Sequence, residues 1–191
     1  MKTVQSVLLA LGLLSSNCQT ASADQQRLAQ SHKNPLGTTD CRVTNDPVGG
    51  DDVPACEGYP SSPTAKVVRI SGWADWYPPG TKDQYVVQYI GLQWSSGQIK
   101  WCGPKVKPQA YLNLAPNETI TGFVVSGGTM VDSIKVTTSK GQNFSVGGDG
   151  GEAHDMDLGN GYMVGWDGFC LPELLVGFAP TFFCDEVGES A

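Results

Sequence analysis

Short runs of alternating apolar and polar residues follow one another along most of the chain. The segment 119–178 shows the pattern most clearly, because clusters of Gly, Asn, Asp or Ser interrupt its apolar-alternating runs every few residues. Alternation with a period of two is typical of β-strands that bury one face. Beyond the first 23 residues, no segment keeps apolar residues at helical spacing for more than two turns. The pattern therefore predicts an all-β chain of short antiparallel strands.

The compact part of the chain is expected to begin near Ala65 and to end at Cys184. A loop is predicted at 71–82, and the strands upstream of residue 119 are predicted at 67–70, 85–94, 99–102 and 111–114. Three strand-turn-strand units packed about an axis would bury the apolar side of each sheet without a long exposed edge. This arrangement predicts one domain over residues 65–184.

The first 23 residues have the pattern of a secretory signal peptide. A charged start at Met1-Lys2 precedes a short apolar run at 7–14 and the small residues Ala21-Ser22-Ala23. The apolar run is too short to span a bilayer, and no later run is long enough to do so. We therefore expect a secreted, extracellular protein that begins near Asp24 and has no membrane span.

Two segments outside the domain lack strand periodicity. Residues 24–64 are polar and rich in Asp, Gly, Pro, Ser and Asn, and residues 185–191 form an acidic tail. The first segment is interpreted as a loop-rich extension that the domain does not need for folding. The chain carries 19 acidic residues against 12 Lys and Arg, for a net charge of -7. An acidic surface repels phosphate backbones, which argues against nucleic acid as a partner.

Six cysteines are present, and removal of the signal peptide with Cys18 leaves five. In a secreted protein these are expected to form disulfides, with one cysteine left over. Local loop closure favours Cys41 with Cys56 and Cys170 with Cys184, although the sequence leaves the connectivity open. Cys102 would then be free, buried or intermolecular. No CxxC occurs, so a zinc or redox role has little support.

Two triplets match the acceptor pattern for N-linked glycans. They begin at Asn117 and Asn143. In a eukaryotic secretory pathway either asparagine could carry a glycan, whereas in a bacterium both would remain bare.

A series of short motifs follows a fixed order in the second half of the chain. The series comprises 118–122, the strand pattern of 131–141, the Gly-rich segment 147–154, Met163–Gly168 and Val176–Phe178, with a hairpin upstream at 87–100. This order resembles the jacalin-type lectin domain over roughly residues 66–180. The resemblance implies the β-prism I fold, in which three short antiparallel sheets form a three-sided prism, and it implies binding of carbohydrate or of glycoprotein glycans.

The resemblance also indicates where a sugar would bind. The family uses a G-x-x-x-D loop between the last two strands together with backbone groups of an early Gly-rich loop. A carboxylate accepts hydrogen bonds from neighbouring sugar hydroxyls, and an aromatic ring covers the apolar face of the sugar. Here Pro172 stands at the Asp position. The candidate carbohydrate-binding residues are therefore Gly168 with its neighbours Asp167, Phe169 and Glu173 in the late loop, and Gly72 and Trp73 in the early one.

Both loops also have interpretations that involve no ligand. The late loop could be a turn braced by a disulfide, and the aromatic residues of 72–77 could pack as a lid over the core. The acidic segment 147–157 resembles a calcium-binding turn but completes no EF-hand pattern. Neither His32 nor His154 belongs to a catalytic motif, and Asp149, Asp155 and Asp167 are acids of a kind that any acidic β protein offers.

The sequence therefore favours a non-catalytic carbohydrate-binding protein with no cofactor and no metal. The alternative is a secreted interaction protein or a cell-wall structural or effector protein on the same fold, with no working sugar site. The sugar and the oligomeric state are left open.

Overall fold

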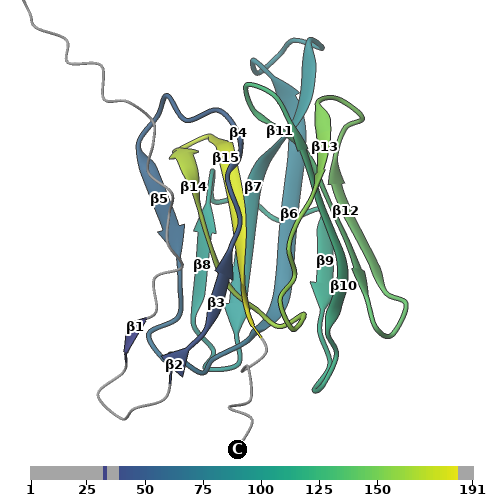
Figure 1. Cartoon of the computed structure of the whole chain (residues 1–191). Coiled ribbons are helices and arrows are strands. Elements are labelled where there is room, and N and C mark those ends of the chain that lie inside the picture. The colour runs from purple at the N-terminus through teal and green to yellow at the C-terminus, as the bar shows by residue number, and fades with distance from the viewer. Residues whose placement is uncertain (1–31, 34–38, 185–191) are drawn as a thin grey trace, which may run out of the picture.

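The computed structural model describes residues 32–33 and 39–184, and within them the chain consists of strands and connecting loops (Figure 1). No helix occurs in this part, so the described chain contains no apolar helix that could cross a membrane. The prediction of an all-β fold is confirmed.

Three antiparallel sheets form the body of the protein. The first sheet has the order β8-β7-β6-β9, with β6 Val67–Tyr77, β7 Gln84–Trp94, β8 Ile99–Cys102 and β9 Ala110–Asn113. The second sheet has the order β12-β11-β10-β13, with β10 Ile120–Gly127, β11 Val131–Thr138, β12 Asn143–Gly147 and β13 Glu152–Asp155.

The remaining sheet, called the terminal sheet below, combines both ends of the described chain. Its order is β3-β15-β14-β5, and β4 also pairs with β15; the strands are β3 Arg42–Thr44, β4 Val48–Gly49, β5 Ala55–Gly58, β14 Met163–Leu171 and β15 Leu174–Phe183. A separate two-stranded ribbon joins β1 His32–Lys33 to β2 Thr39–Asp40.

The apolar faces of the three sheets meet in one core. Phe123 of the second sheet stacks on Phe178 of the terminal sheet, with ring centroids 6.1 Å apart, and meets Phe182 edge-on at 6.0 Å. The Trp94 indole of the first sheet donates a hydrogen bond of 2.7 Å to the carbonyl oxygen of Val164 in the terminal sheet. Burial of these large side chains supplies the main favourable free energy of folding.

The domain boundary predicted at residue 65 does not separate an extension from the sheets. Val43 pairs with Phe182 at one edge of the terminal sheet, and Gly58 pairs with Trp166 near the other. Val48 is buried in the common core. The strands β3, β4 and β5 contain only two to four residues each, which is too short for an alternating pattern to be visible in the sequence.

The predicted loop at 71–82 is also shorter than expected. Strand β6 continues to Tyr77, and Trp76 near the end of the strand packs edge-on against Tyr85 of β7 with ring centroids 5.3 Å apart. The hairpin of β6 and β7 extends beyond the neighbouring strands at one end of the prism (Figure 1). By contrast, the strand predicted at 99–102 matches β8 residue for residue.

The disulfide pairing predicted from local loop closure is wrong. Cys41 is bonded to Cys184, and the sulfur of Cys170 lies within bonding distance of both Cys56 and Cys102. Cys41 and Cys56 cannot meet, because they flank or belong to strands at opposite edges of the terminal sheet. Cys170 and Cys184 cannot meet either, because Cys170 lies near the turn of the β14–β15 hairpin and Cys184 follows its far end.

One buried carboxylate connects the first two sheets. Glu118, in the link between β9 and β10, accepts hydrogen bonds from the Ala115 amide at 2.9 Å, from the Thr138 hydroxyl and from the Gln142 side-chain amide at 2.7 and 2.9 Å. The hydrogen bond from Thr138 and the one from the Ala115 backbone hold the pKa of Glu118 below its ordinary value of 4.5.

Candidate functional site

Loops of all three sheets close one end of the prism around a small apolar cluster, called the end cluster below. Its buried residues are Val86, Leu174 and Val176, and the half-buried residues packed against them are Val53, Tyr77, Met130, Phe169 and Leu171. The loops at this end are therefore held by side-chain packing. Protein groups that contact a ligand here would have to lie around the cluster, because the cluster side chains are packed against one another.

The predicted late sugar-binding loop is a tight turn at this end. Leu171 pairs with Leu174, so only Pro172 and Glu173 lie between the paired strands. Glu173 is exposed, whereas the flanking leucines and Phe169 pack into the end cluster. The turn thus presents one exposed carboxylate.

Asp167 and Gly168 lie within strand β14 and not in a loop. The Tyr59 hydroxyl donates a hydrogen bond to the Asp167 carboxylate and lies 2.9 Å from the Thr181 hydroxyl. Burial, followed by the hydrogen bond to Asp167, raises the pKa of Tyr59. Gly168 pairs with Phe178, and a Cβ at Gly168 would overlap the carbonyl oxygen of Gly177. The structure gives both residues partners within the terminal sheet.

Gly72 and Trp73 lie in strand β6, away from the late turn. A Cβ on Gly72 would press on the side chains of Val146 and Phe144, so this glycine lets two sheets approach each other. Trp73 is half-buried and pairs with Tyr89. Tyr77, at the end of the same strand, reaches the end cluster. The six candidate residues are therefore not brought together into one site.

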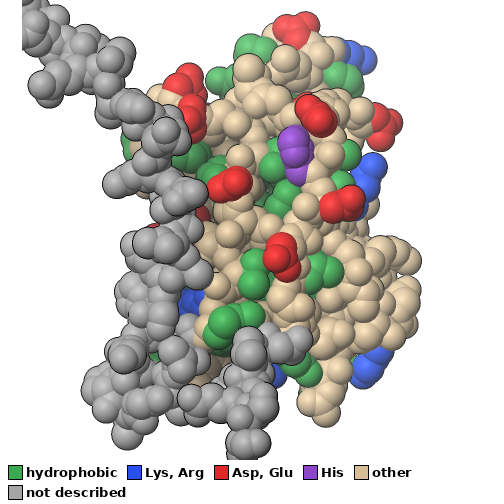
Figure 2. Space-filling model, viewed as in Figure 1, with side chains coloured by type: hydrophobic (Ala, Val, Ile, Leu, Met, Phe, Trp, Pro, Cys, Tyr) green, Lys and Arg blue, Asp and Glu red, His purple; other side chains and the backbone are tan. Residues whose placement is uncertain are grey.

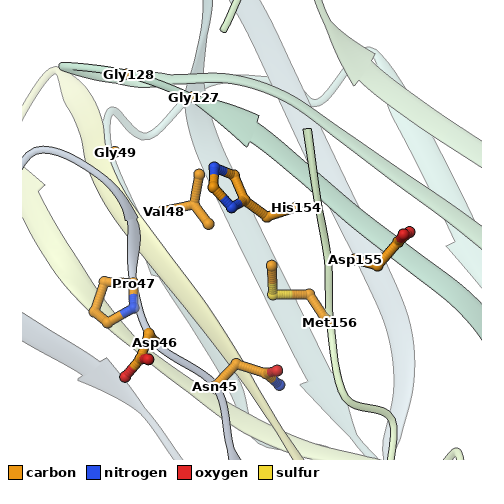
Figure 3. Close-up of a pocket in the computed structure, with 10 residues that line it drawn as sticks. All are labelled: Asn45, Asp46, Pro47, Val48, Gly49, Gly127, Gly128, His154, Asp155 and Met156. Atoms are coloured by element: carbon orange, nitrogen blue, oxygen red, sulfur yellow. The ribbon is translucent and has the colours of Figure 1, made fainter. Parts of the chain in front are cut away.

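A groove of about 530 Å³ lies between the terminal sheet and the second sheet, beside this end of the prism (Figure 3). Its volume is in the range of pockets that hold small molecules. Three segments line the groove: the one around β4, the turn after β10, and the end of β13 with the residue that follows it. The lining residues are Asn45, Asp46, Pro47, Val48, Gly49, Gly127, Gly128, His154, Asp155 and Met156.

The side chains of the groove combine an imidazole, apolar groups and carboxylates. Val48, His154 and Met156 point toward the same space, whereas Asp155 points away from it (Figure 3). Asp46 is exposed and lies on the opposite wall from His154, with its carboxylate turned away from the imidazole (Figure 3). Figure 2 shows this face of the molecule, on which a histidine is surrounded by acidic side chains.

Asn45 fixes the two walls of the groove relative to each other. Its side-chain amide nitrogen donates to the carbonyl oxygens of Asp157 at 3.0 Å and Pro180 at 2.8 Å, and its Oδ1 accepts the Asp157 amide at 2.7 Å. The segment that follows β13 is thereby tied to the terminal sheet. A groove with fixed walls is preorganised for a ligand, which reduces the ordering cost of binding.

Glycines leave the backbone bare at the upper end of the groove. Gly49 has a φ of 110°, and a Cβ there would overlap the Val176 carbonyl oxygen. Gly128 is exposed, and a Cβ on it would meet no other atom within 4 Å. Sequence reasoning missed Asn45–Gly49 because it assigned them to the extension. The paired glycines at 49–50 and 127–128 are the signal that could have identified them.

Within the described residues, the carboxylates considered for calcium binding or catalysis are distributed over several elements. Within residues 39–184, the group of three metal-ligating side chains close enough to share an ion consists of Cys56, Cys102 and Cys170 and includes no carboxylate of the segment 147–157. Asp149 lies in the β12–β13 loop, Asp155 on β13, and Asp167 on β14 beside Tyr59. The two candidate glycan acceptors, Asn117 and Asn143, are both exposed.

No protein-family model matches the sequence, and no curated protein matches it either. Solved structures do match the fold. The lamprey immune protein superposes with a TM-score of 0.63 at 16% identity, over 75% of this chain and 44% of that protein, so the match spans less than half of its length. Malaysian banana lectin gives 0.57 at 13% identity, over 75% of this chain and 99% of the lectin. Calsepa lectin, in complex with a bisected glycan, gives 0.54 at 14% identity, over 75% and 97%.

The architecture agrees with these matches. Three antiparallel sheets surround a common core in this chain, and the superposition covers the two lectins almost completely. The chain therefore has the β-prism I fold of the jacalin-type lectins.

Proposed function

We propose that this protein is a secreted, non-catalytic carbohydrate-binding protein and that the groove between β4 and β13 holds the sugar. The fold is shared with lectins, one of which is in complex with a glycan. Fold alone does not establish function, so the proposal depends on the groove.

The observation that carries the proposal is the set of groups around the groove. Asp46 offers a carboxylate that can accept hydrogen bonds from two adjacent hydroxyls, and the His154 imidazole can donate one. Half-buried Met156, beside the small exposed part of Val48, offers apolar surface to the C–H face of a sugar ring. The bare backbone at Gly128 lets a ring approach closely.

Secretion is part of the proposal. The signal-peptide pattern of residues 1–23 lies outside the described residues. Support comes from the cysteines, because the Cys41–Cys184 bond closes a long segment of chain, and such bonds persist mainly in oxidising compartments. N-terminal sequencing of the exported protein tests this part, and a mature chain that begins near Asp24 is expected.

A glycan array probed with the disulfide-intact protein tests sugar binding. Titration of an array hit should show that Asp46→Asn and His154→Ala each weaken binding about tenfold or more, because each removes a polar partner worth roughly 1.5–3 kcal/mol. Asp75→Asn, at an exposed carboxylate on β6, serves as the matched control and should bind like the parent.

Two further variants test the other proposed residues. Glu173→Gln changes the carboxylate of the late turn, and Trp73→Ala removes the aromatic ring on β6. If one of these loses binding while Asp46→Asn and His154→Ala do not, the sugar lies at that position and not in the groove. If the parent protein binds no glycan, sugar binding is contradicted.

A second candidate function is an interaction or cell-wall structural protein on the same fold. One observation favours it: the late loop is reduced to the two residues Pro172 and Glu173 and its flanking leucines are packed away. In addition, Trp101 and Tyr111 are 45% and 49% exposed on the first sheet. This function is supported if the array stays negative while the parent binds intact cell-wall material and Trp101→Ala with Tyr111→Ala abolishes that binding.

A further inference from the structure

Three cysteines converge on one point between two sheets. The Sγ atoms of Cys56, Cys102 and Cys170 all lie within 4.8 Å of one another, and Cys170 has its Cα 5.9 Å from that of each of the other two. Both Cα separations suit a disulfide. Because a sulfur atom forms only one disulfide at a time, Cys170 can be bonded to Cys56 or to Cys102 but not to both.

The two alternative bonds connect different parts of the fold. Cys56 lies on β5 and Cys170 on β14, and these strands are already hydrogen-bonded where Gly168 pairs with Cys56. A Cys56–Cys170 bond therefore joins neighbours within the terminal sheet. Cys102 ends β8 of the first sheet, so a Cys102–Cys170 bond joins two sheets covalently.

Burial distinguishes the two residues that compete for Cys170. Cys102 is only 3% exposed, whereas Cys56 is half-buried on an edge strand. The thiolate is the reactive form of cysteine, and it forms readily where water can solvate it. The remaining two cysteines of the described chain, Cys41 and Cys184, are bonded to each other.

We infer that Cys170 is the shared partner of two exchangeable disulfides, with Cys102–Cys170 as the resting bond and Cys56 as the reactive thiol. This site lies outside the groove and does not depend on sugar binding.

The exchange needs no outside oxidant or reductant. The Cys56 thiolate attacks Sγ of Cys170, a Cys56–Cys170 bond forms as the Cys102–Cys170 bond breaks, and Cys102 leaves as the thiolate and takes up a proton. One disulfide and one thiol are present before and after. The same Cys56 thiolate can attack a low-molecular-weight disulfide RSSR, which yields Cys56–S–SR and releases RS⁻. Such capping would block the exchange and hold the bond between the sheets.

Non-reducing peptide mapping of the full-length protein tests the inference. The protein is alkylated with N-ethylmaleimide under mildly acidic native conditions, either at once or after incubation at pH 8. Among the five cysteines at 41–184, immediate alkylation should modify Cys56 alone and leave a linked Cys102–Cys170 peptide. Incubation at pH 8 should let the two bonds interconvert, so that a fraction of the molecules yields a Cys56–Cys170 peptide. This fraction should reach its plateau at a rate that rises about tenfold per pH unit while the thiol is mainly protonated.

Two variants and an internal control sharpen the test. Cys56→Ser should hold all molecules as Cys102–Cys170, Cys102→Ser should form Cys56–Cys170, and the Cys41–Cys184 peptide should be unchanged in every sample. If Cys102→Ser does not fold, mapping of the parent before and after incubation at pH 8 still shows whether the two bonds exchange. A single fixed pairing that does not change at pH 8 would overturn the inference. So would three free thiols with one equivalent of metal found by elemental analysis, since the cluster would then be a metal site.

Discussion

The terminal sheet and the two other sheets are built from the chain in opposite ways. The first and second sheets each use consecutive strands, β6–β9 and β10–β13. The terminal sheet instead joins 42–58 to 163–183, so its pairing must wait until distant segments meet. Closing a long loop costs conformational entropy before any stabilising contact can form.

The position of the cysteines reflects this difference. Cys41, Cys56, Cys170 and Cys184 all lie in or next to strands of the terminal sheet, whereas only Cys102 among the described cysteines comes from the first sheet. Covalent bonds therefore occur where the sheet is assembled from distant segments. Among the described residues, no disulfide lies within either sheet made of local hairpins, and Cys102 connects the first of them to Cys170 of the terminal sheet.

The largest expected effect comes from removing one half of the terminal sheet. A chain that begins at Ala65 lacks β3, β4 and β5 and loses buried Val48 from the core. We expect no cooperative thermal transition and no near-ultraviolet circular dichroism signal from packed aromatic residues. A truncated chain that unfolds like the parent would show that the terminal sheet needs only β14 and β15.

A cut without a deletion provides the control. A protease site inserted between Ser61 and Ser62, in the link from β5 to β6, allows the folded protein to be cleaved there. The Cys41–Cys184 bond would retain the cleaved segment. The cleaved protein should keep its near-ultraviolet signal, so that loss of the strands can be separated from loss of chain continuity.

The next effect concerns the bond that joins the two ends of the terminal sheet. The double variant Cys41→Ser with Cys184→Ser opens a bond between residues 143 positions apart. Without the cross-link the unfolded chain regains conformational entropy, which should lower the free energy of unfolding by about 3–5 kcal/mol. Thermal denaturation should show a fall in Tm of about 10 °C. Cys56→Ser leaves this bond intact and should unfold near the parent. Equal Tm values for the double variant and the parent would contradict the role given to this bond.

The smallest effect involves the local sheets. Because the pKa of Glu118 is lower in the folded protein, its hydrogen bonds stabilise the fold fully above the unfolded value near 4.5. That stabilisation should be lost as the pH falls through the lower folded pKa. Glu118→Gln should therefore be less stable at pH 7 and should converge with the parent in acid, as measured by chemical denaturation at a series of pH values. Glu152→Gln, at an exposed position on β13, is the control, and its stability should depend on pH as that of the parent does.

The local sheets were accessible from the sequence because their strands are long enough to show a period. In the second half of β11, Ile134, Val136 and Thr138 are buried while Lys135 and Thr137 are exposed, and this alternation predicts the strand. In β3 and β4 only a few residues pair with β15, and nothing in their own sequence specifies a partner more than 100 residues away.

The candidate site was less accessible for a related reason. The glycines that flank Asp167 suggest a loop, but they sit where sheet neighbours approach closely. His154 stands out in the sequence only as a histidine within an acidic segment. Its position opposite Val48 depends on the pairing of the terminal sheet, which the sequence does not reveal. The glycine pairs at 49–50 and 127–128 are visible in the sequence, but only the fold places them together.

The adjacency of Cys41 and Cys184, whose Cα atoms lie 5.4 Å apart, has a consequence for engineering. A domain whose entrance and exit lie side by side can be inserted into a surface loop of another protein without forcing the host loop apart. The same adjacency permits circular permutation: a short linker can join the two positions, and new ends can be opened at Gly80, where an added Cβ would meet no atom within 4 Å. The prism can thus be inserted into another protein as a unit, with the groove on its outer face.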